Sequence, residues 1–532
     1  MPRKQHLQYL RPDIQAEPLI DSWYAWTYMI PPATRARNLT ERNIRTMESY
    51  IAAPEVHAMA VKNPKMLGGP FVDYNGKRVE EVEQLLRHTI ASRQGLLQLS
   101  EALVKLDQLI ESHARGDSLR LVYLKVPELL RGCVELFYDL YNNISYRIIE
   151  PLMYNAWRDR EQGQSIALSR TVGDDRPFIL STPRLPSETA LELTIPFRSN
   201  ILDKLFAAKR SPKECDSLME QCGLLSRDHE LFRSMFTCDA PKQYTKYSGS
   251  GVRWRYFGHA CILIETQTSS YLFDPMLSYT YESSISRYTY EDLPEHIEYV
   301  FITHNHNDHV LLETLLQLRE RIGYVVVPRN GGGMLADPSL KLILQEIGFK
   351  NVLEITELQT IPLNDGYVMG LPFFGEHADL NVQSKIAYLL EINGNKLMFA
   401  ADSCNFEPTL YQRLREIVGS VRALFIGMEC DGSPGSWLYG PLYGKRLPWA
   451  YDQARRMNGA NCDEVISILD SIECREVFVY AMGQEPWLNY LLCVKYTDES
   501  NPIVQSNQLI QRCRDRGIAA ERLFGERELV LE

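Results

Sequence analysis

The chain has 532 residues, of which 45% are hydrophobic and 23% charged, and its formal net charge is −11. This length predicts two or more domains, and this composition is typical of a soluble globular protein. The acidic balance disfavours a nucleic-acid partner. No signal peptide and no apolar run long enough to cross a membrane is visible, and the 11 cysteines form no C-x-x-C pair. We therefore expect a cytoplasmic protein with reduced thiols and no membrane partner.

The first half of the chain reads mainly as helix. Apolar residues recur at helical spacing over 79–113. We expect a second helical stretch over 127–146, an extended piece at 176–183, and further helices between 200 and 236. The polar, turn-rich stretch CDAPKQYTKYSGSG follows at 238–251, and we place a domain boundary there, after residue 246.

Beyond this boundary, short apolar runs alternate with helical segments. VRWRYF, CILIET, SYLFD, YVFITH and YVVVP read as strands, and Asn393-Gly394 predicts a hairpin. The pattern predicts an α/β arrangement with sheets sandwiched between helices. We thus expect a mainly helical α+β N-terminal domain over 1–246 and an α/β catalytic domain over 247–532.

The stretch FITHNHNDHV at 301–310 concentrates histidines where a predicted strand ends. His304 and His306 are two residues apart, so in extended backbone they project to the same side. Asp308 and His309 follow where the chain turns into a helix. Imidazoles beside a carboxylate at this spacing are typical metal ligands, so one short segment can serve two adjacent ions.

This segment resembles the H-x-H-x-D-H signature of the metallo-β-lactamase fold superfamily, and the resemblance extends over about 250–490. It implies an αββα sandwich. FGHACILIET and YLFDP look like the opening strands, and Asp274 matches a residue that supports the ligand segment. Asp402 in LMFAADS stands where the superfamily has its bridging aspartate.

Two departures separate this chain from the zinc hydrolases of the superfamily. Where they carry a further histidine ligand, FFGEHADL offers both Glu376 and His377. Adjacent residues in extended backbone point to opposite sides, so we expect only one of them to reach the metals. The last predicted strand, EVFVYAM, lacks the usual final histidine, and no histidine follows His377. A carboxylate-rich ligand set with an open position favours iron over zinc.

This combination resembles the di-iron β-hydroxylases of the chloramphenicol pathway. The resemblance implies hydroxylation, with two iron ions and dioxygen, of an amino acid tethered as a thioester to a nonribosomal peptide synthetase carrier domain, with p-aminophenylalanine as the expected amino acid. It implies a homodimer and an N-terminal domain that serves dimerisation and carrier docking. It also implies the metal ligands His304, His306, Asp308, His309, Glu376 and Asp402. The sequence shows no flavin or nicotinamide fingerprint, so we expect an external reductase to supply electrons.

Glu376 and Glu429 are the residues to which we assign catalytic roles. Glu429 ends the apolar run ALFIGM, where a carboxylate could bind a ligand or the substrate amine; Asp431 is equally well explained as a solvated charge. The aromatic loop 431–449 could line a pocket or form a lid, and packing explains it as well. Two alternatives stay open: a zinc-dependent hydrolase or thioesterase, and a non-enzymatic scaffold.

Overall fold

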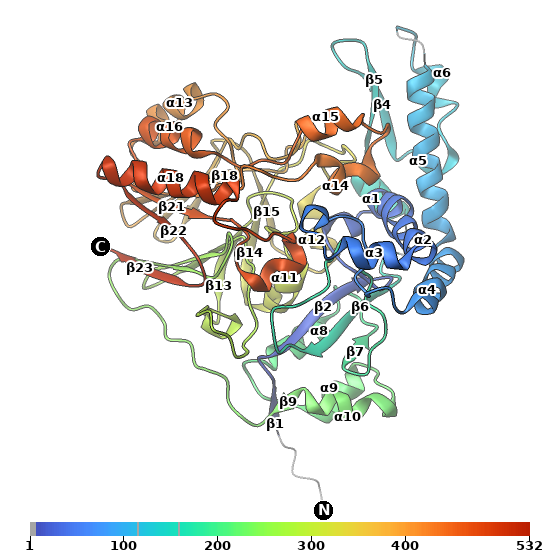
Figure 1. The fold of residues 1–532 in the computed structure, drawn as a ribbon, viewed down its shortest axis with the longest axis horizontal. Coiled ribbons are helices and arrows are strands. Elements are labelled where there is room, and N and C mark those ends of the chain that lie inside the picture. The colour runs from blue at the N-terminus through green and yellow to red at the C-terminus, as the bar shows by residue number, and fades with distance from the viewer. Residues whose placement is uncertain (1–6, 114–115, 158–159) are drawn as a thin grey trace, which may run out of the picture.

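An antiparallel sheet forms the base of the N-terminal half in the computed structural model, which describes residues 7–113, 116–157 and 160–532 (Figure 1). Its central strands, β2 (Ile14–Ile20) and β6 (Gln164–Arg170), pair along their whole length. The outer strands are β3 (Trp23–Tyr24) and β7 (Ala190–Leu193). A second small sheet contains β1 (Leu7–Leu10), β8 (Lys213–Glu214) and β9 (Phe236–Thr237).

The helices of residues 32–123 lie together, in blue, on one side of this half in Figure 1. The π-helical segment η2 (Leu39–Ile44) joins α1 (Pro32–Asn38) to α2 (Arg45–Ala52) without a break. The predicted helix over 79–113 is confirmed but divides at Arg93 into α4 (Val79–Ser92) and α5 (Gln94–Ser112). The other helices are α3 (Pro54–Ala60), α6 (Arg120–Tyr123), α7 (Glu150–Ala156), α8 (Asn200–Ala207), α9 (Cys215–Gln221) and α10 (His229–Ser234).

Two predictions for the N-terminal half were wrong. The expected helix over 127–146 is a hairpin of β4 (Val134–Tyr138) and β5 (Ile144–Ile148). Its turn is fixed by Asp139, whose carboxylate accepts the N–H groups of Tyr141 and Asn143, so local side-chain bonding overrides the apolar spacing. The expected extended piece at 176–183 is irregular, and its Ile179 N–H bonds to the carbonyl of Tyr490.

Two seven-stranded sheets face each other in the second half. Each begins antiparallel and continues parallel. The first contains β10 (Val252–Tyr256), β11 (Ile262–Glu265), β12 (Ser270–Phe273), β13 (Ile297–Phe301), β14 (Ile322–Pro328), β15 (Val352–Ile355) and β23 (Arg527–Leu531). The second contains β16 (Thr360–Leu363), β17 (Gly366–Leu371), β18 (Ala387–Ile392), β19 (Asn395–Phe399), β20 (Ala423–Gly427), β21 (Glu476–Tyr480) and β22 (Ala519–Arg522).

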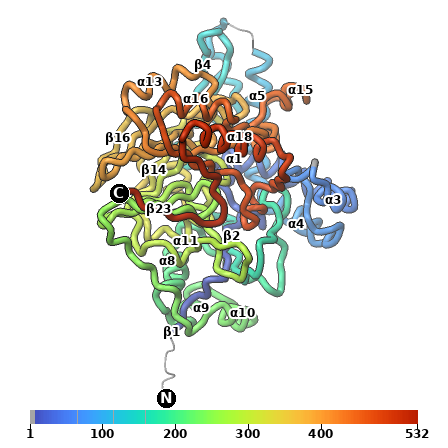
Figure 2. Tube along the Cα trace, turned by 60° about the vertical axis from the view of Figure 1, so that its left-hand side comes forward, coloured from blue at the N-terminus to red at the C-terminus, as the bar shows by residue number. Residues whose placement is uncertain are grey.

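The sheets meet along stacked aromatic rings, with the centroids of Phe273 and Phe399 3.9 Å apart. The C-terminal strand β23 joins the first sheet beside β10, and the red C-terminal end of the chain lies against green segments in Figure 2. Helices α11 (Leu312–Leu318) and α12 (Leu340–Glu346) pack on one outer face, and α13 (Thr409–Val418), α16 (Cys462–Ile472) and α18 (Asn501–Asp515) on the other. Strands buried on both faces explain the continuous apolar runs. The predicted αββα sandwich after an α+β half is confirmed.

The turns and loops between these strands and helices position the site. The hairpin predicted at Asn393-Gly394 joins β18 to β19, with φ +48° and +76°. Residues 238–251 cross from β9 to β10 without helix or strand. Three short helices, α14 (Gly435–Tyr439), α15 (Trp449–Ala454) and α17 (Asn489–Leu492), lie in the long loops of the second half. Across the described residues, no helix is both long and apolar enough to traverse a bilayer.

A buried ionic cluster holds the two halves together. The guanidinium of Arg176 lies 2.7 Å from Glu17 in β2 and 2.7 Å from Glu313 in α11. Arg184 adds a second cation at 2.7 Å from Glu17, and the Arg176 guanidinium stacks 3.6 Å from the Tyr490 ring centroid. Burial alone would raise the pKa of Glu17, but the charges of Arg184 and Arg176 outweigh it and lower that pKa to about 2.

Removing one charge of this cluster should destabilise the protein. In Glu17→Gln the two arginines lose their shared carboxylate, and uncompensated buried charge typically costs about 3–5 kcal/mol. Urea unfolding at neutral pH measures the loss. Because the pKa of Glu17 is lowered from 4.5 to about 2, its contribution is present above about pH 4.5 and disappears as the pH falls towards 2. The difference between wild type and Glu17→Gln should shrink over that window.

The control for this prediction is the exposed pair Glu101–Lys105, whose side chains are 63% and 61% exposed. Such pairs contribute about 0–1 kcal/mol, so Glu101→Gln should unfold almost as the wild type does. Equal stabilities of Glu17→Gln and Glu101→Gln would contradict a joining role for the buried cluster.

Candidate metal centre

The predicted ligand segment leaves the carboxyl end of β13 and crosses the edge of both sheets. The backbone of His304 forms an isolated bridge with Lys385, just before β18, so it is held between the sheets. His304 and His309 are fully buried and His306 nearly so. The edge where parallel strands end is the usual position of functional side chains in such sheets.

One group of possible ligands contains His304, His306 and Glu376. Glu376 Oε1 lies 2.7 Å from His306 Nδ1, and its Oε2 lies 3.7 Å from His304 Nε2. These ligand atoms converge although Glu376 lies 70 residues further along the chain than His306.

A second group lies beside the first. His309 Nε2 is 3.8 Å from Asp308 Oδ2 and 3.0 Å from Asp402 Oδ2. Asp402 Oδ2 is also 3.7 Å from His304 Nε2, so Asp402 stands between the two groups. The structure therefore brings together the six residues that the sequence singled out as metal ligands.

The loop that carries Glu376 differs from the extended backbone we expected. Glu376 has φ +69° and Ala378 φ +52°, so this is a tight turn with left-handed residues. The turn directs Glu376 to the histidines and places His377 behind His306, with ring centroids 4.5 Å apart. His377 Nδ1 lies 2.9 Å from Glu376 Oε2. The imidazole packs against the group rather than completing it.

Hydrogen bonds outside the two groups fix the imidazoles. Asp274 Oδ2 accepts from Thr303 at 2.6 Å and lies 2.8 Å from His309 Nδ1. Asp274 therefore supports a histidine of the ligand segment, as its resemblance implied, and leaves Nε2 of His309 directed inward. Such partners fix the orientation and tautomer of metal-binding imidazoles.

Two tyrosines that sequence reasoning missed act in the same way on His306. His306 Nε2 lies 2.8 Å from the hydroxyl of Tyr439, which hydrogen-bonds to the hydroxyl of Tyr28. Tyr28 donates to the carbonyl of Ala336 at 2.7 Å. Tyr439 must therefore donate to Tyr28 and accept from Nε2 of His306, so in the neutral imidazole Nδ1 is the nitrogen without a proton. No spacing in the sequence links Tyr28 to Tyr439; only the fold does.

The π-helical segment η2 and α1 hold the loop that carries Tyr439. Arg42 donates to the carbonyls of Trp437 and Leu438 at 3.0 and 2.8 Å, and Arg37 donates to that of Pro441 at 3.0 Å. Burial lowers the pKa of Arg42 to about 10, so it stays charged at neutral pH. Part of the predicted aromatic loop 431–449 is thus fixed from the N-terminal half.

A cavity of about 460 Å³ opens onto these groups and contains the predicted Glu429. Its wall includes Phe178 and Leu180 from the N-terminal half and Leu438 and Asp431 from the second half. Burial, together with the charges of Asp308 and Asp402, raises the pKa of Glu429 well above its ordinary value. The buried hydroxyl of Tyr496, a wall residue that the sequence did not reveal, lacks a hydrogen-bond partner.

Carboxylates and imidazoles of the cluster shift one another's pKa values. Burial would raise the pKa of Glu376, but the charges of His306 and His377 lower it to about 2. Burial would lower the pKa of His309, yet Asp402 and Asp274 raise it well above its ordinary range. The opposite charges therefore stabilise one another in this buried region.

These residues fit two metal ions. His304 Nε2 and Asp402 Oδ1 are buried atoms without a hydrogen-bond partner, and both residues belong to groups of possible metal ligands. Native proteins rarely leave such atoms unsatisfied, so an inward-facing set of them indicates bound cations. The mixture of three imidazoles and three carboxylates suits iron.

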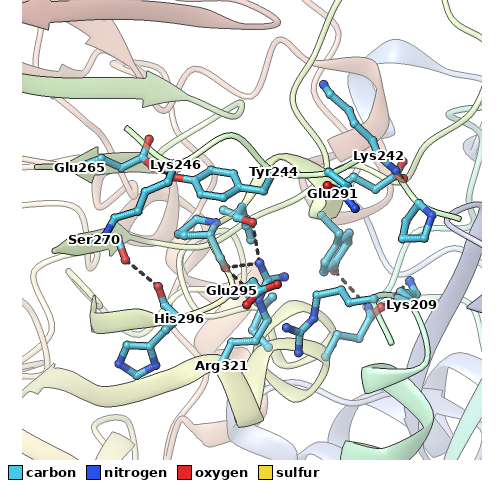
Figure 3. Close-up of a pocket in the computed structure, with 18 of the residues that line it drawn as sticks. Lys209, Lys242, Tyr244, Lys246, Glu265, Ser270, Glu291, Glu295, His296 and Arg321 are labelled. Carbon is cyan, nitrogen blue, oxygen red and sulfur yellow. Dashed lines mark hydrogen bonds between the residues drawn. The ribbon is translucent and has the colours of Figure 1, made fainter. Parts of the chain in front are cut away.

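A larger cavity, of about 530 Å³, lies elsewhere, beneath residues 240–246 (Figure 3). Its buried polar groups already bond to the protein: Ser270 donates to the carbonyl of His296 at 2.7 Å, and Lys209 donates to Gln317 at 2.8 Å. Lys242 pairs with Asp292 at 2.6 Å. Unlike the cavity at the histidines, it presents no unsatisfied ligand set among the described residues.

Comparison with known proteins identifies the family. Residues 9–241 match the diiron non-heme β-hydroxylase N-terminal domain, and residues 270–430 match the β-lactamase superfamily domain. The 4-amino-L-phenylalanyl-[CmlP-peptidyl-carrier-protein] 3-hydroxylase of Streptomyces venezuelae is 40% identical, over 98% of this chain and 99% of its own. The chain belongs to the diiron non-heme β-hydroxylase family.

Solved structures of this β-hydroxylase family agree over the whole chain. CmlA, a diiron β-hydroxylase from Streptomyces venezuelae, superposes with a TM-score of 0.93 at 39% identity, covering 99% of this chain and 100% of that one. A mutant of the CmlA β-hydroxylase gives a TM-score of 0.91 at 39% identity, over 98% and 100% of the two chains. As a member of the family, the protein is a monooxygenase that uses two iron ions and dioxygen. The hydrolase and scaffold alternatives are not supported.

Replacing Tyr439 by Phe tests the hydrogen bond to His306. Without the hydroxyl, Nε2 of His306 loses its acceptor, and loss of such partners typically weakens metal binding about 10–100-fold. Competition with an iron chelator measures the affinity. Tyr443→Phe, on the same loop, is the matched control because its buried hydroxyl has no partner. Unchanged iron affinity in Tyr439→Phe would show that the tyrosine pair is dispensable.

Proposed function

We propose that the protein hydroxylates the β-carbon of 4-aminophenylalanine held as a thioester on a carrier domain of a nonribosomal peptide synthetase, in chloramphenicol-type antibiotic biosynthesis. The observation that carries this proposal is the set of possible ligands. Glu376 lies beside His304 and His306, and strand β21 ends without a histidine. The whole-chain similarity to an enzyme named for that substrate supports the choice of amino acid and carrier.

The six convergent side chains are the proposed iron ligands. We assign His304, His306 and Glu376 to one ion, Asp308 and His309 to the other, and Asp402 to a place between them. The short distances from Glu376 to His304 and His306, and from His309 to Asp308 and Asp402, support this division. When bound, the iron pair supplies the activation of dioxygen. One oxygen atom enters the C–H bond and the other leaves as water, with two electrons and two protons supplied from outside.

The cavity at the ligands determines which carbon is presented. The apolar side chains of Phe178, Leu180 and Leu438 suit an aromatic ring, while the proposed ligands Glu376 and Asp308 line the inner end. The walls come from both halves of the chain, so the substrate enters between them and is screened from water. Binding and orientation are therefore tasks of these loops.

Glu429 is the proposed acceptor for the substrate's α-amine. Its carbonyl accepts the N–H of Gly459 at 2.9 Å, which fixes the residue at the end of β20, and its carboxyl group lines the cavity. The amine is attached to the carbon next to the β-carbon, so a β-carbon held at the inner end brings the amine close to Glu429. The hydroxyl of Tyr496 offers a further partner on the same wall.

The N-terminal half, with the proposed boundary after residue 246, is also the proposed surface for dimerisation and for carrier docking. Exposed apolar side chains support this role: Leu140 and Tyr141 at the tip of the β4–β5 hairpin, and Leu121 and Leu124 at α6. We also propose that electrons come from a separate reductase, since no nucleotide-binding glycine fingerprint is found in the sequence.

Mass spectrometry of the carrier tests the reaction. Incubation of iron-loaded protein with 4-aminophenylalanyl carrier, dioxygen and a reductant should add one oxygen atom to the acyl group. Glu376→Ala should abolish this product, because one ion loses its carboxylate ligand. Asp379→Ala is the control, since this side chain of the same loop is 71% exposed. Hydroxylation by Glu376→Ala would refute the ligand assignment, and acyl release with two zinc ions per chain would favour a hydrolase.

Glu429→Gln tests the amine contact. A charge-assisted hydrogen bond contributes about 1.5–3 kcal/mol, so we expect KM for the carrier substrate to rise about 10–100-fold. Iron content should stay at the wild-type level. The matched control is Asp431→Asn, an exposed wall residue that should change KM little. If Glu429→Gln lost iron instead of substrate affinity, Glu429 would belong to the metal ligands.

A further inference from the structure

Besides His377, a further imidazole lies at the metal centre outside the ligand segment. His259 is in the turn between β10 and β11 and is fully buried. Its Nε2 lies 3.1 Å from Oδ2 of Asp308, and its ring meets that of His309 edge to face with centroids 5.2 Å apart. No residue of the H-x-H-x-D-H segment supplies this imidazole.

The turn after β21 holds His259 in place. The N–H of Ala481 donates to the carbonyl of His259 at 2.8 Å, and the N–H of Gly483 donates to its Nδ1 at 3.2 Å. The turn itself carries no histidine, and it holds an imidazole that comes from another segment of the chain.

The backbone of His259 is in a conformation that few side chains adopt. Its φ is +50°, and Gly258 before it has φ +108°. A histidine in the left-handed region is uncommon, and such residues persist where the surrounding structure needs their side chain at one place. The two hydrogen bonds from the turn after β21 supply that restraint.

The hydrogen bonds also determine where the proton of His259 lies. The N–H of Gly483 can donate only to a nitrogen with a free lone pair, so Nδ1 carries no proton. In the neutral imidazole the proton is therefore on Nε2. Since Nε2 faces Asp308 Oδ2, the imidazole donates a hydrogen bond to that carboxylate oxygen.

We propose that His259 is a positioning residue for the iron centre, which donates Nε2–H to Oδ2 of Asp308 and so fixes the orientation of this carboxylate. His259 would then act as a hydrogen-bond donor to a ligand and not as a ligand itself. This inference depends on the proposed assignment of Asp308 as a ligand.

Two substitutions of His259 distinguish a hydrogen-bond donor from a metal ligand. Gln keeps an N–H group near the position of Nε2, whereas Leu keeps bulk without any donor. We expect the full-length His259→Leu protein to bind iron about 10–100-fold more weakly than wild type in chelator competition. His259→Gln should stay within about threefold of wild type, as the retained donor replaces the lost one.

Each outcome of this competition decides the inference. Iron binding by His259→Leu as tight as wild type would show that the contact has no positioning role. Equal weakening in both variants would show that the imidazole itself is required, as a ligand would be. Thermal unfolding of the metal-free variants serves as the folding check. Failure of wild type to bind iron would overturn the proposed function instead, so the two failures are distinguishable.

Nitrogen-15 NMR of histidine-labelled, zinc-loaded protein gives a second readout independent of activity and of iron. The signal of His259 is the one that disappears in His259→Gln. We expect a slowly exchanging proton on its Nε2 and an unprotonated Nδ1. An unprotonated, metal-bound Nε2, or a proton on Nδ1, would overturn the proposal even if the substitutions weakened iron binding.

Discussion

The organisation of the molecule follows from crowding five carboxyl groups and several imidazoles into one desolvated region. Asp274, Asp308, Glu376, Asp402 and Glu429 all lie at the edge where the two sheets end. Like charges cannot be buried together without compensation. Two metal cations provide that compensation, which explains why buried oxygens and nitrogens face inward without protein partners. The hydrogen bonds around the site keep these oxygens and nitrogens directed inward.

Each imidazole of the ligand segment has one nitrogen occupied by the protein. His309 is tied to Asp274, His306 to Tyr439, and His304 Nδ1 lies 3.0 Å from the hydroxyl of Thr303. The other nitrogen is thereby committed to the interior. The residues that bond to these outer nitrogens therefore matter as much as the ligands, because they decide which nitrogen of each imidazole carries the proton.

The fold of the second half could be predicted from the sequence because the signals in that part of the chain are local. Strands buried on both faces give apolar runs, Asn393-Gly394 marks a hairpin, and the ligand segment is contiguous. The N-terminal half was harder to predict. Asp139 turns an apolar stretch into a hairpin through side-chain hydrogen bonds, and residues 176–183 are shaped by contacts with Tyr490 instead of by a strand partner.

The tyrosine pair that hydrogen-bonds to His306 could not be predicted either, and here the reason is different. Tyr28 and Tyr439 are separated by 411 positions, and their contact depends on how the N-terminal half lies over the second half. The sequence favoured Glu376 over His377 as the ligand, but it did not indicate that the backbone of Glu376 is in a left-handed turn.

The cavity wall has a consequence for how relatives of this protein can diverge. All six proposed ligands lie in the second half, whereas Pro64, Leu67, Phe178 and Leu180 come from the first. Substitutions in those segments can reshape the space for the acyl group without disturbing the metals. The part of the cavity wall that the first half contributes can thus change independently of the residues that hold the metals.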